Sequence, residues 1–143
     1  MSTKGPSESR IRLIRALFLL FATTSFALGG WMVVDPASAW ASMGIEVGPT
    51  PLVQALYGGA ILGEGLISAL GVVWPVRYLV FLQYMVAYKA FACLAAIALL
   101  LQGEAPPVAG WMVVASWAFP AVASAAVFPW KQWSNVEEWY GAQ

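Results

Sequence analysis

The sequence predicts an all-α membrane protein whose four transmembrane helices form a bundle. Of its 143 residues, 61% are hydrophobic and only 10% are charged, and the mean hydropathy is +0.74. Such a composition is typical of a chain embedded in a bilayer. Four apolar runs each reach the roughly 20 residues that a helix needs to cross the hydrocarbon core, where strands would leave backbone groups unpaired. We therefore expect one integral membrane domain over residues 1–143.

The expected transmembrane helices cover residues 13–34, 52–73, 76–101 and 108–128. The first follows a basic segment and precedes Ala37-Ser38-Ala39, a combination that resembles a secretory signal with its cleavage site. Its apolar run is longer than the core of a signal peptide, which has about 7–15 residues. We therefore interpret it as a retained span.

A short helix is expected between the first two spans, over residues 36–43. Asp35, followed by proline, is a suitable N-cap, and Gly44 ends the run. Trp40 and Met43 then share one face of this helix. We expect it to lie flat at the outer membrane interface.

The second span is rich in small residues, and two of its glycines form a G-x-x-x-G motif. These glycines, Gly59 and Gly63, share one helical face, where a second backbone can approach closely. Gly58 and Gly65 are further candidate packing positions on the same helix. We expect the motif to pack inside the protein's own bundle rather than against another chain.

The last span and the segment after it carry further signals. Pro120 cannot donate to the carbonyl of Ser116, so we expect the fourth span to bend there. Residues 134–140 combine a capping-box pattern with aromatic residues, which predicts a cytoplasmic amphipathic segment at the membrane surface.

Positively charged residues gather on one side of the predicted topology. They precede the first span, lie at the turn between the second and third spans, and follow the fourth, whereas the outer loops carry Asp35, Glu46 and Glu104. The positive-inside rule then places both termini in the cytoplasm. The signal-like start of the first span indicates insertion into a bacterial inner membrane or an equivalent bilayer. A net charge of zero argues against nucleic acid as a partner.

The residue inventory excludes several chemistries. The chain has no histidine and one cysteine, Cys93, so it cannot by itself ligate haem, copper, zinc or an iron–sulfur cluster. We expect no catalytic residues, no enzymatic activity and no cofactor, although a bound lipid or pigment is compatible with the composition.

Glu64 and Lys89 are charged residues deep inside the second and third apolar runs. If these runs are antiparallel helices joined at Trp74-Pro75, their backbone levels differ by only about 5 Å at 1.5 Å per residue. A lysine side chain spans that gap, and a charge left alone in hydrocarbon costs several kcal/mol. The two residues are therefore expected to form an intramembrane ion pair.

The role of this pair stays open among three possibilities. It could fix the register of the two helices, bind the polar part of a small ligand, lipid or pigment, or relay protons. For the binding alternative, the expected ligand-lining residues are Tyr57, Tyr84, Tyr88 and Gln83. Nothing else in the sequence forms a constellation around a reacting atom.

Several short motifs resemble a bacterial family of small four-helix integral membrane proteins of unknown function. They are Leu28-Gly29, Asp35-Pro36, Met43-Gly44-Ile45, Ala55-Leu56-Tyr57-Gly58-Gly59, and Gly103 with Pro106-Pro107. The resemblance implies a four-helix bundle. It supplies no activity and no catalytic residues.

Two functions are compatible with these observations. The first hypothesis is a noncatalytic accessory or assembly subunit of a larger inner-membrane complex, such as a photosynthetic or respiratory one, acting by helix packing. Its partners would be the lipid bilayer and other membrane protein chains. The alternative is a membrane protein that binds or translocates a small ligand, lipid or proton through Glu64 and Lys89.

Overall fold

The protein folds as the predicted all-α bundle. The computed structural model describes residues 7–46 and 51–130, and within these ranges the regular secondary structure is helical throughout. The helices are α1 (Glu8–Val34), α2 (Pro36–Ala41), α3 (Leu52–Val73), α4 (Leu79–Gln102) and α5 (Pro107–Val127). All but α2 are long and apolar enough to cross a membrane, so the chain is a multi-pass membrane protein. The amphipathic segment expected over residues 134–140 lies outside the described residues.

The first helix begins before the apolar run does. The Ser7 hydroxyl accepts a hydrogen bond from the backbone N–H of Arg10 at 3.4 Å, which caps the helix. The carboxylate of Glu8, the next residue, pairs with the guanidinium of Arg12 one turn further on. These polar contacts extend α1 by more than a turn beyond the expected start at residue 13.

The other helix ends follow turn chemistry. α3 has the expected bounds, whereas α4 begins later than residue 76 because Val76 lies in the turn after Pro75, where the N–H of Leu79 bonds to its carbonyl at 3.2 Å. α2 stops at Ala41, short of the expected residue 43, and Gly44 then adopts a positive φ of 75°. Gly103, with a φ of 72°, ends α4.

The four long helices associate as two pairs, with α1 along α3 and α4 along α5. The α1–α3 pair is especially close, since a Cβ added to Gly29 would lie 2.8 Å from the carbonyl oxygen of Gly58. A Cβ added to Gly58 would in turn lie 2.7 Å from the Cβ of Met32. The backbones meet where side chains are absent, which is how membrane helices gain van der Waals contact.

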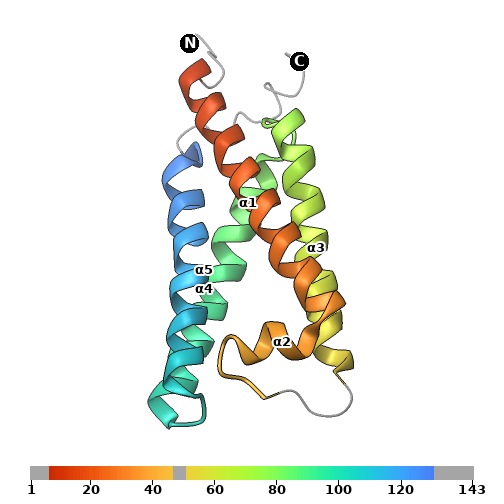
Figure 1. The fold of residues 1–143 in the computed structure, drawn as a ribbon. Helices are drawn as coiled ribbons and strands as arrows, with labels where there is room; N and C mark the ends of the chain where they lie inside the picture. The colour runs from red at the N-terminus through yellow and green to blue at the C-terminus, as the bar shows by residue number, and fades with distance from the viewer. Residues whose placement is uncertain (1–6, 47–50, 131–143) are drawn as a thin grey trace.

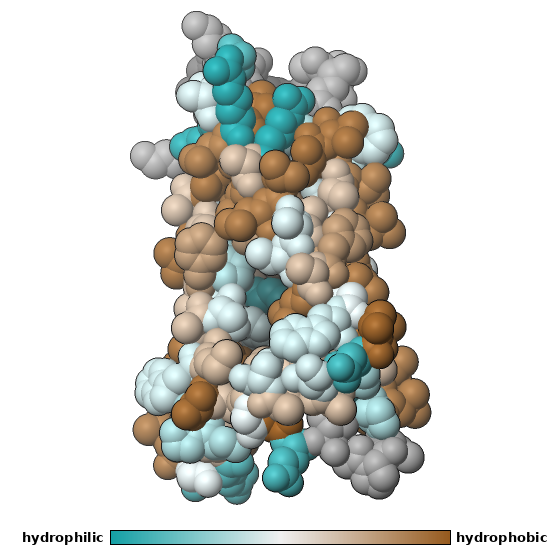
Figure 2. All heavy atoms as spheres, viewed as in Figure 1, coloured by the Kyte–Doolittle hydropathy of each residue, from teal (hydrophilic) through white to brown (hydrophobic). Residues whose placement is uncertain are grey.

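The bundle has a basic end and an acidic end, which lie at the top and at the bottom of Figure 1. At the basic end, α1 begins, α3 passes into α4 and α5 finishes; this end carries Arg10, Arg12, Arg15 and Arg77. At the acidic end, α2 lies across the bundle (Figure 1). Figure 2 shows hydrophilic residues concentrated at both ends and a mostly hydrophobic surface between them.

Each end has its own apolar core. The cluster at the basic end includes Phe18, Leu79 and Leu82, all completely buried. The cluster at the acidic end joins Met32 and Ala39 to Ile61, with Trp40, Met43 and Tyr57 packed against them. Between the two clusters lies the level of the intramembrane charges.

Candidate functional site

The structure forms the expected ion pair between Glu64 and Lys89. The Lys89 ammonium lies 2.9 Å from Oε2 and 3.2 Å from Oε1 of Glu64, so it donates to both carboxylate oxygens. Only 8% of the lysine side chain and 12% of the glutamate side chain are exposed. Two opposite charges are thus held together inside the bundle.

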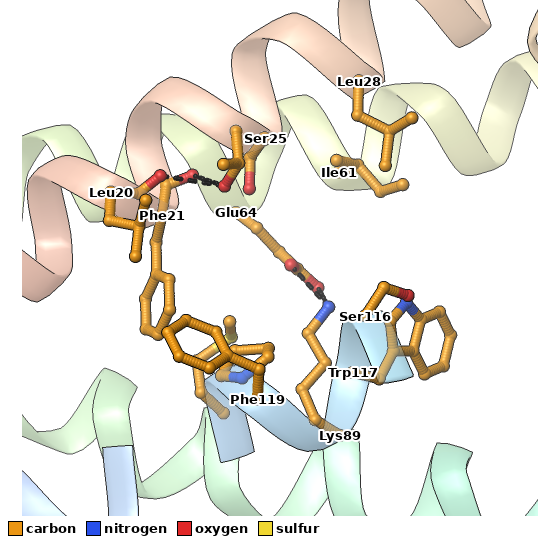
Figure 3. A pocket seen from close by; sticks show the side chains of 13 residues that line it. Leu20, Phe21, Ser25, Leu28, Ile61, Glu64, Lys89, Ser116, Trp117 and Phe119 are labelled. Atoms are coloured by element: carbon orange, nitrogen blue, oxygen red, sulfur yellow. Dashed lines mark hydrogen bonds and ion pairs between the residues drawn. The ribbon is translucent and has the colours of Figure 1, made fainter. Parts of the chain in front are cut away.

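The pair bridges the two helix pairs. Glu64 belongs to α3, which packs on α1, and Lys89 belongs to α4, which packs on α5. Figure 3 shows the two side chains reaching toward each other across the space between these units. Because α3 and α4 make little backbone contact, the ion pair is a principal polar link between the halves of the bundle.

Aromatic rings surround the lysine. Its Nζ lies 4.9 Å from the ring centroid of Tyr88 and 4.9 Å from that of Trp117, close enough for cation–π attraction on both. Tyr57 stacks on Trp117 with ring centroids 6.2 Å apart. The ring of Trp40, in α2, packs on Tyr57 with centroids 5.6 Å apart. The ammonium is therefore stabilised by a carboxylate on one side and by aromatic faces on others.

A cavity of about 250 Å³ adjoins the ion pair. Its walls come from α1, α3, α4 and α5, and Figure 3 shows many of these side chains around one open space. Polar groups on the walls are Glu64, Lys89, Thr24, Ser25 and Ser116. The apolar lining residues are Leu20, Phe21, Leu28, Ile61, Met85, Trp117, Phe119 and Pro120. A mostly apolar chamber with a few convergent polar groups is the usual form of a small-molecule site.

The four expected ligand-lining residues lie elsewhere. None of Tyr57, Tyr84, Tyr88 and Gln83 is among the residues that line this cavity. Tyr57 and Tyr88 instead contact Trp117, and so lie one layer behind the wall. Tyr84 is half exposed and stacks on Tyr88 with centroids 5.4 Å apart.

The glycines of α3 divide between two faces. Gly58 and Gly65 face α1, as expected of packing positions, and Ile61, Ser68 and Gly71 complete the same buried stripe. Gly59 and Gly63 face outward, and a Cβ at either would meet no described atom within 4 Å. This outward placement differs from the internal packing that we expected for the G-x-x-x-G motif.

Sequence reasoning missed the residues that α1 and α5 contribute. Thr24 and Ser25 of α1 and Ser116 of α5 are hydroxyl residues inside apolar runs, which was a usable signal. This signal did not identify them as cavity residues, because the sequence does not say which helices are neighbours. Trp117 carries no such signal, since tryptophans occur throughout the chain.

No group of three or more His, Cys, Asp or Glu side chains suited to a metal ion gathers in residues 7–46 and 51–130. Comparisons with protein-family models, with curated proteins and with solved structures found no match to this chain.

Proposed function

We propose that the protein is a noncatalytic membrane-embedded binding protein whose cavity holds a small amphipathic molecule against the Glu64–Lys89 pair. The single observation that carries this proposal is the open space beside a buried ion pair. Here the two charges form part of a chamber wall.

The energetic cost of the pair supports a use beyond packing. Burying two charges costs several kcal/mol per ion, and hydrophobic replacements of similar volume are often neutral or stabilising by about 1–4 kcal/mol. We therefore expect a bundle with Met or Leu at both positions to be about as stable as the wild type or more so. Ionisable residues inside membrane segments tend to mark sites for ligands, ions or protons.

The size of the cavity limits the ligand. An apolar cavity of about 150 Å³ holds benzene, and pockets for drug-sized ligands have about 300–1,000 Å³. The volume of about 250 Å³ therefore suits a single polar head with a short length of chain or one ring system.

Binding fits this geometry better than translocation does. A proton or ion path needs polar groups or water along the membrane normal. Here packed apolar clusters close the chamber toward the basic end, around Phe18 and Leu82, and toward the acidic end, around Met32 and Ala39.

Two neighbouring threonines provide a matched test. Thr23 and Thr24 are both exposed, and each donates its hydroxyl hydrogen to the carbonyl four residues earlier at 2.8 Å, but only Thr24 lines the cavity. Thr24→Phe fills the cavity, whereas Thr23→Phe adds the same bulk at an exposed position that does not line it. Each protein is purified from its native membrane in mild detergent, and the molecules that co-purify are extracted and identified by mass spectrometry.

The proposal predicts one compound that is present with the wild type and with Thr23→Phe and is lost with Thr24→Phe. A wild-type extract that holds only bulk lipid, identical to that of both variants, contradicts it. Size-exclusion profiles of the three proteins show whether each is folded.

The accessory-subunit hypothesis is a second candidate, and it rests on a separate observation. The outward face of α3 carries Gly59 and Gly63 between Leu56 and Leu66, which are 64% and 58% exposed. A surface with this shape suits a helix of another membrane chain. Such a partner would bind on the opposite side of α3 from α1, so this function is compatible with ligand binding.

A further inference from the structure

The cavity opens on the side of the bundle, between α1 and α5. The lining residues from these helices include exposed side chains, with Leu20 43%, Leu28 37% and Phe119 60% exposed. Those from α3 and α4 are more deeply placed, with Ile61 7% and Met85 2% exposed. α1 and α5 therefore form the mouth, and α3 and α4 form the floor. Figure 2 shows a hollow at this height with a hydrophilic residue at its bottom.

The mouth lies at the level of the hydrocarbon. Thr24 is near the middle of the apolar part of α1, and Ser116 is near the middle of α5. Both helices have the length of a membrane crossing, so their midpoints lie in the bilayer core rather than at its surface. Since the apolar clusters at both ends close the chamber along the bundle axis, the bilayer is the compartment that the mouth faces.

The floor of the cavity is electrically neutral. The carboxylate of Glu64 accepts from the ammonium of Lys89 through both oxygens, so the two charges cancel locally. A ligand head with a net charge would add an uncompensated charge in a region of low dielectric constant. An uncharged head escapes that penalty.

The pair still offers hydrogen-bond acceptors. The ammonium of Lys89 contacts both oxygens of Glu64 and lies 4.9 Å from the ring centroids of Tyr88 and Trp117. A carboxylate accepts about four hydrogen bonds, and among the described residues Glu64 accepts only those from Lys89. An uncharged hydroxyl can therefore donate to a free acceptor site of this carboxylate.

We infer that the ligand is a long-chain alcohol dissolved in the bilayer and that it reaches Glu64 and Lys89 sideways, through the opening between α1 and α5. Its hydroxyl head binds the ion pair, and its hydrocarbon tail passes between Leu20, Leu28 and Phe119 into the lipid. This inference rests on the proposed binding function and names the ligand class and the route.

Photolabelling in vesicles tests it. The full chain is reconstituted in phosphatidylcholine vesicles that contain hexadecanol with a diazirine on its chain, and the labelled positions are mapped by peptide mass spectrometry after illumination. Labelling is expected to concentrate on the mouth, at residues 20–28 and 116–119. It should be lost in Thr24→Phe and retained in Thr23→Phe.

Competitors separate the head chemistry from the route. Unlabelled hexadecanol is expected to remove the mouth labelling, whereas hexadecyltrimethylammonium, with a charged head, and butanol, which is soluble in water, are expected to leave it. If hexadecyltrimethylammonium removes the labelling at the same concentration as hexadecanol, the neutral-head assignment is overturned. If butanol removes it at the same concentration as hexadecanol, access from the bilayer is overturned. Label spread evenly over the lipid-facing surfaces of all four long helices overturns the inference as a whole.

A second pair of variants keeps the test decisive if Thr24→Phe does not fold. Ser116→Phe blocks the mouth from α5, and its neighbour Ala115 is exposed but does not line the cavity, so Ala115→Phe is the control.

The failure of the proposed function is distinguishable from the failure of this inference. The proposed function fails if no compound co-purifies with the wild type. A co-purifying compound that is lost in Thr24→Phe, together with uniform photolabelling, leaves the binding function standing and removes the alcohol and its route.

Discussion

At the scale of single residues, Glu64 and Lys89 determine the character of the bundle's centre. Lys89 is 6% exposed as a residue and carries its charge between a carboxylate and the rings of Tyr88 and Trp117. The sequence was sufficient to predict that the two charges meet, because an unpaired charge in hydrocarbon is too costly and their levels on adjacent helices agree.

Removing one charge of this pair should harm the protein more than removing both. Glu64→Gln or Lys89→Met leaves an uncompensated buried charge, which costs about 3–5 kcal/mol, whereas the double variant buries none. We expect the thermal unfolding midpoint in detergent to fall for each single variant and to recover in the double variant. The midpoint is measured as the temperature at which the monodisperse peak disappears from the size-exclusion profile. Single variants that unfold at the wild-type temperature would mean that the charges reach water.

At the scale of helices, two adjacent glycines of α3 have opposite environments. Gly58 touches α1, where an added Cβ would come within 2.7 Å of Met32 and 3.0 Å of the Gly29 carbonyl, whereas Gly59 has open space around it. Adjacent positions on a helix point about 100° apart, so one of them can face a neighbour while the other faces lipid.

Gly58→Ala and Gly59→Ala should therefore change the stability of the protein in opposite directions. We expect Gly58→Ala to destabilise the α1–α3 pair by about 1–3 kcal/mol, because the backbones must separate. Gly59→Ala should be neutral or stabilising by up to about 1 kcal/mol, since alanine is the better helix former. Unfolding in graded sodium dodecyl sulfate measures both, and equal destabilisation would place Gly59 in an internal contact.

The outward face of α3 gives a separate prediction for association. Gly59→Leu with Gly63→Leu should leave the monomer folded, because a Cβ added at either position would meet no described side chain and no other helix within 4 Å. If a helix of another chain occupies this face, the double variant loses it. Chemical cross-linking in native membranes is expected to show a product with the wild type that the double variant lacks, and a product that persists in the double variant removes this face as the interface.

The helix ends show where sequence patterns suffice and where they fail. The apolar run predicted α3 correctly, but it underestimated α1, whose first turn is made of polar residues held by Ser7 and Glu8. Hydropathy detects what lies in the hydrocarbon and not the helix that continues beyond it. The G-x-x-x-G motif likewise marks a face open to close approach without saying which helix approaches.

At the scale of the whole molecule, the arrangement of the helices accounts for what the sequence could not predict. Pairing α1 with α3 and α4 with α5 leaves the cavity between the pairs. Trp117 and Thr24 become lining residues only through that pairing, whereas Tyr57 and Tyr88 are displaced behind the wall. Helix–helix pairing in lipid depends on detailed shape, which composition and periodicity do not encode.

The distribution of arginines predicts the orientation of the molecule. The basic end, with Arg10, Arg12, Arg15 and Arg77, should face the cytoplasm. Fusions of alkaline phosphatase, which is active only outside the cytoplasm, are expected to be active in the loop at residues 103–107 and inactive at the C-terminus. The opposite pattern would reverse the topology.

The central claim is that the cavity beside Glu64 and Lys89 holds a small molecule. Native mass spectrometry of the intact protein, released from a mild detergent micelle, measures this directly. We expect the wild type and Thr23→Phe to carry one bound molecule of the same mass and Thr24→Phe to appear at the mass of the polypeptide alone. A wild type without a bound molecule, or equal occupancy in Thr23→Phe and Thr24→Phe, would contradict the claim.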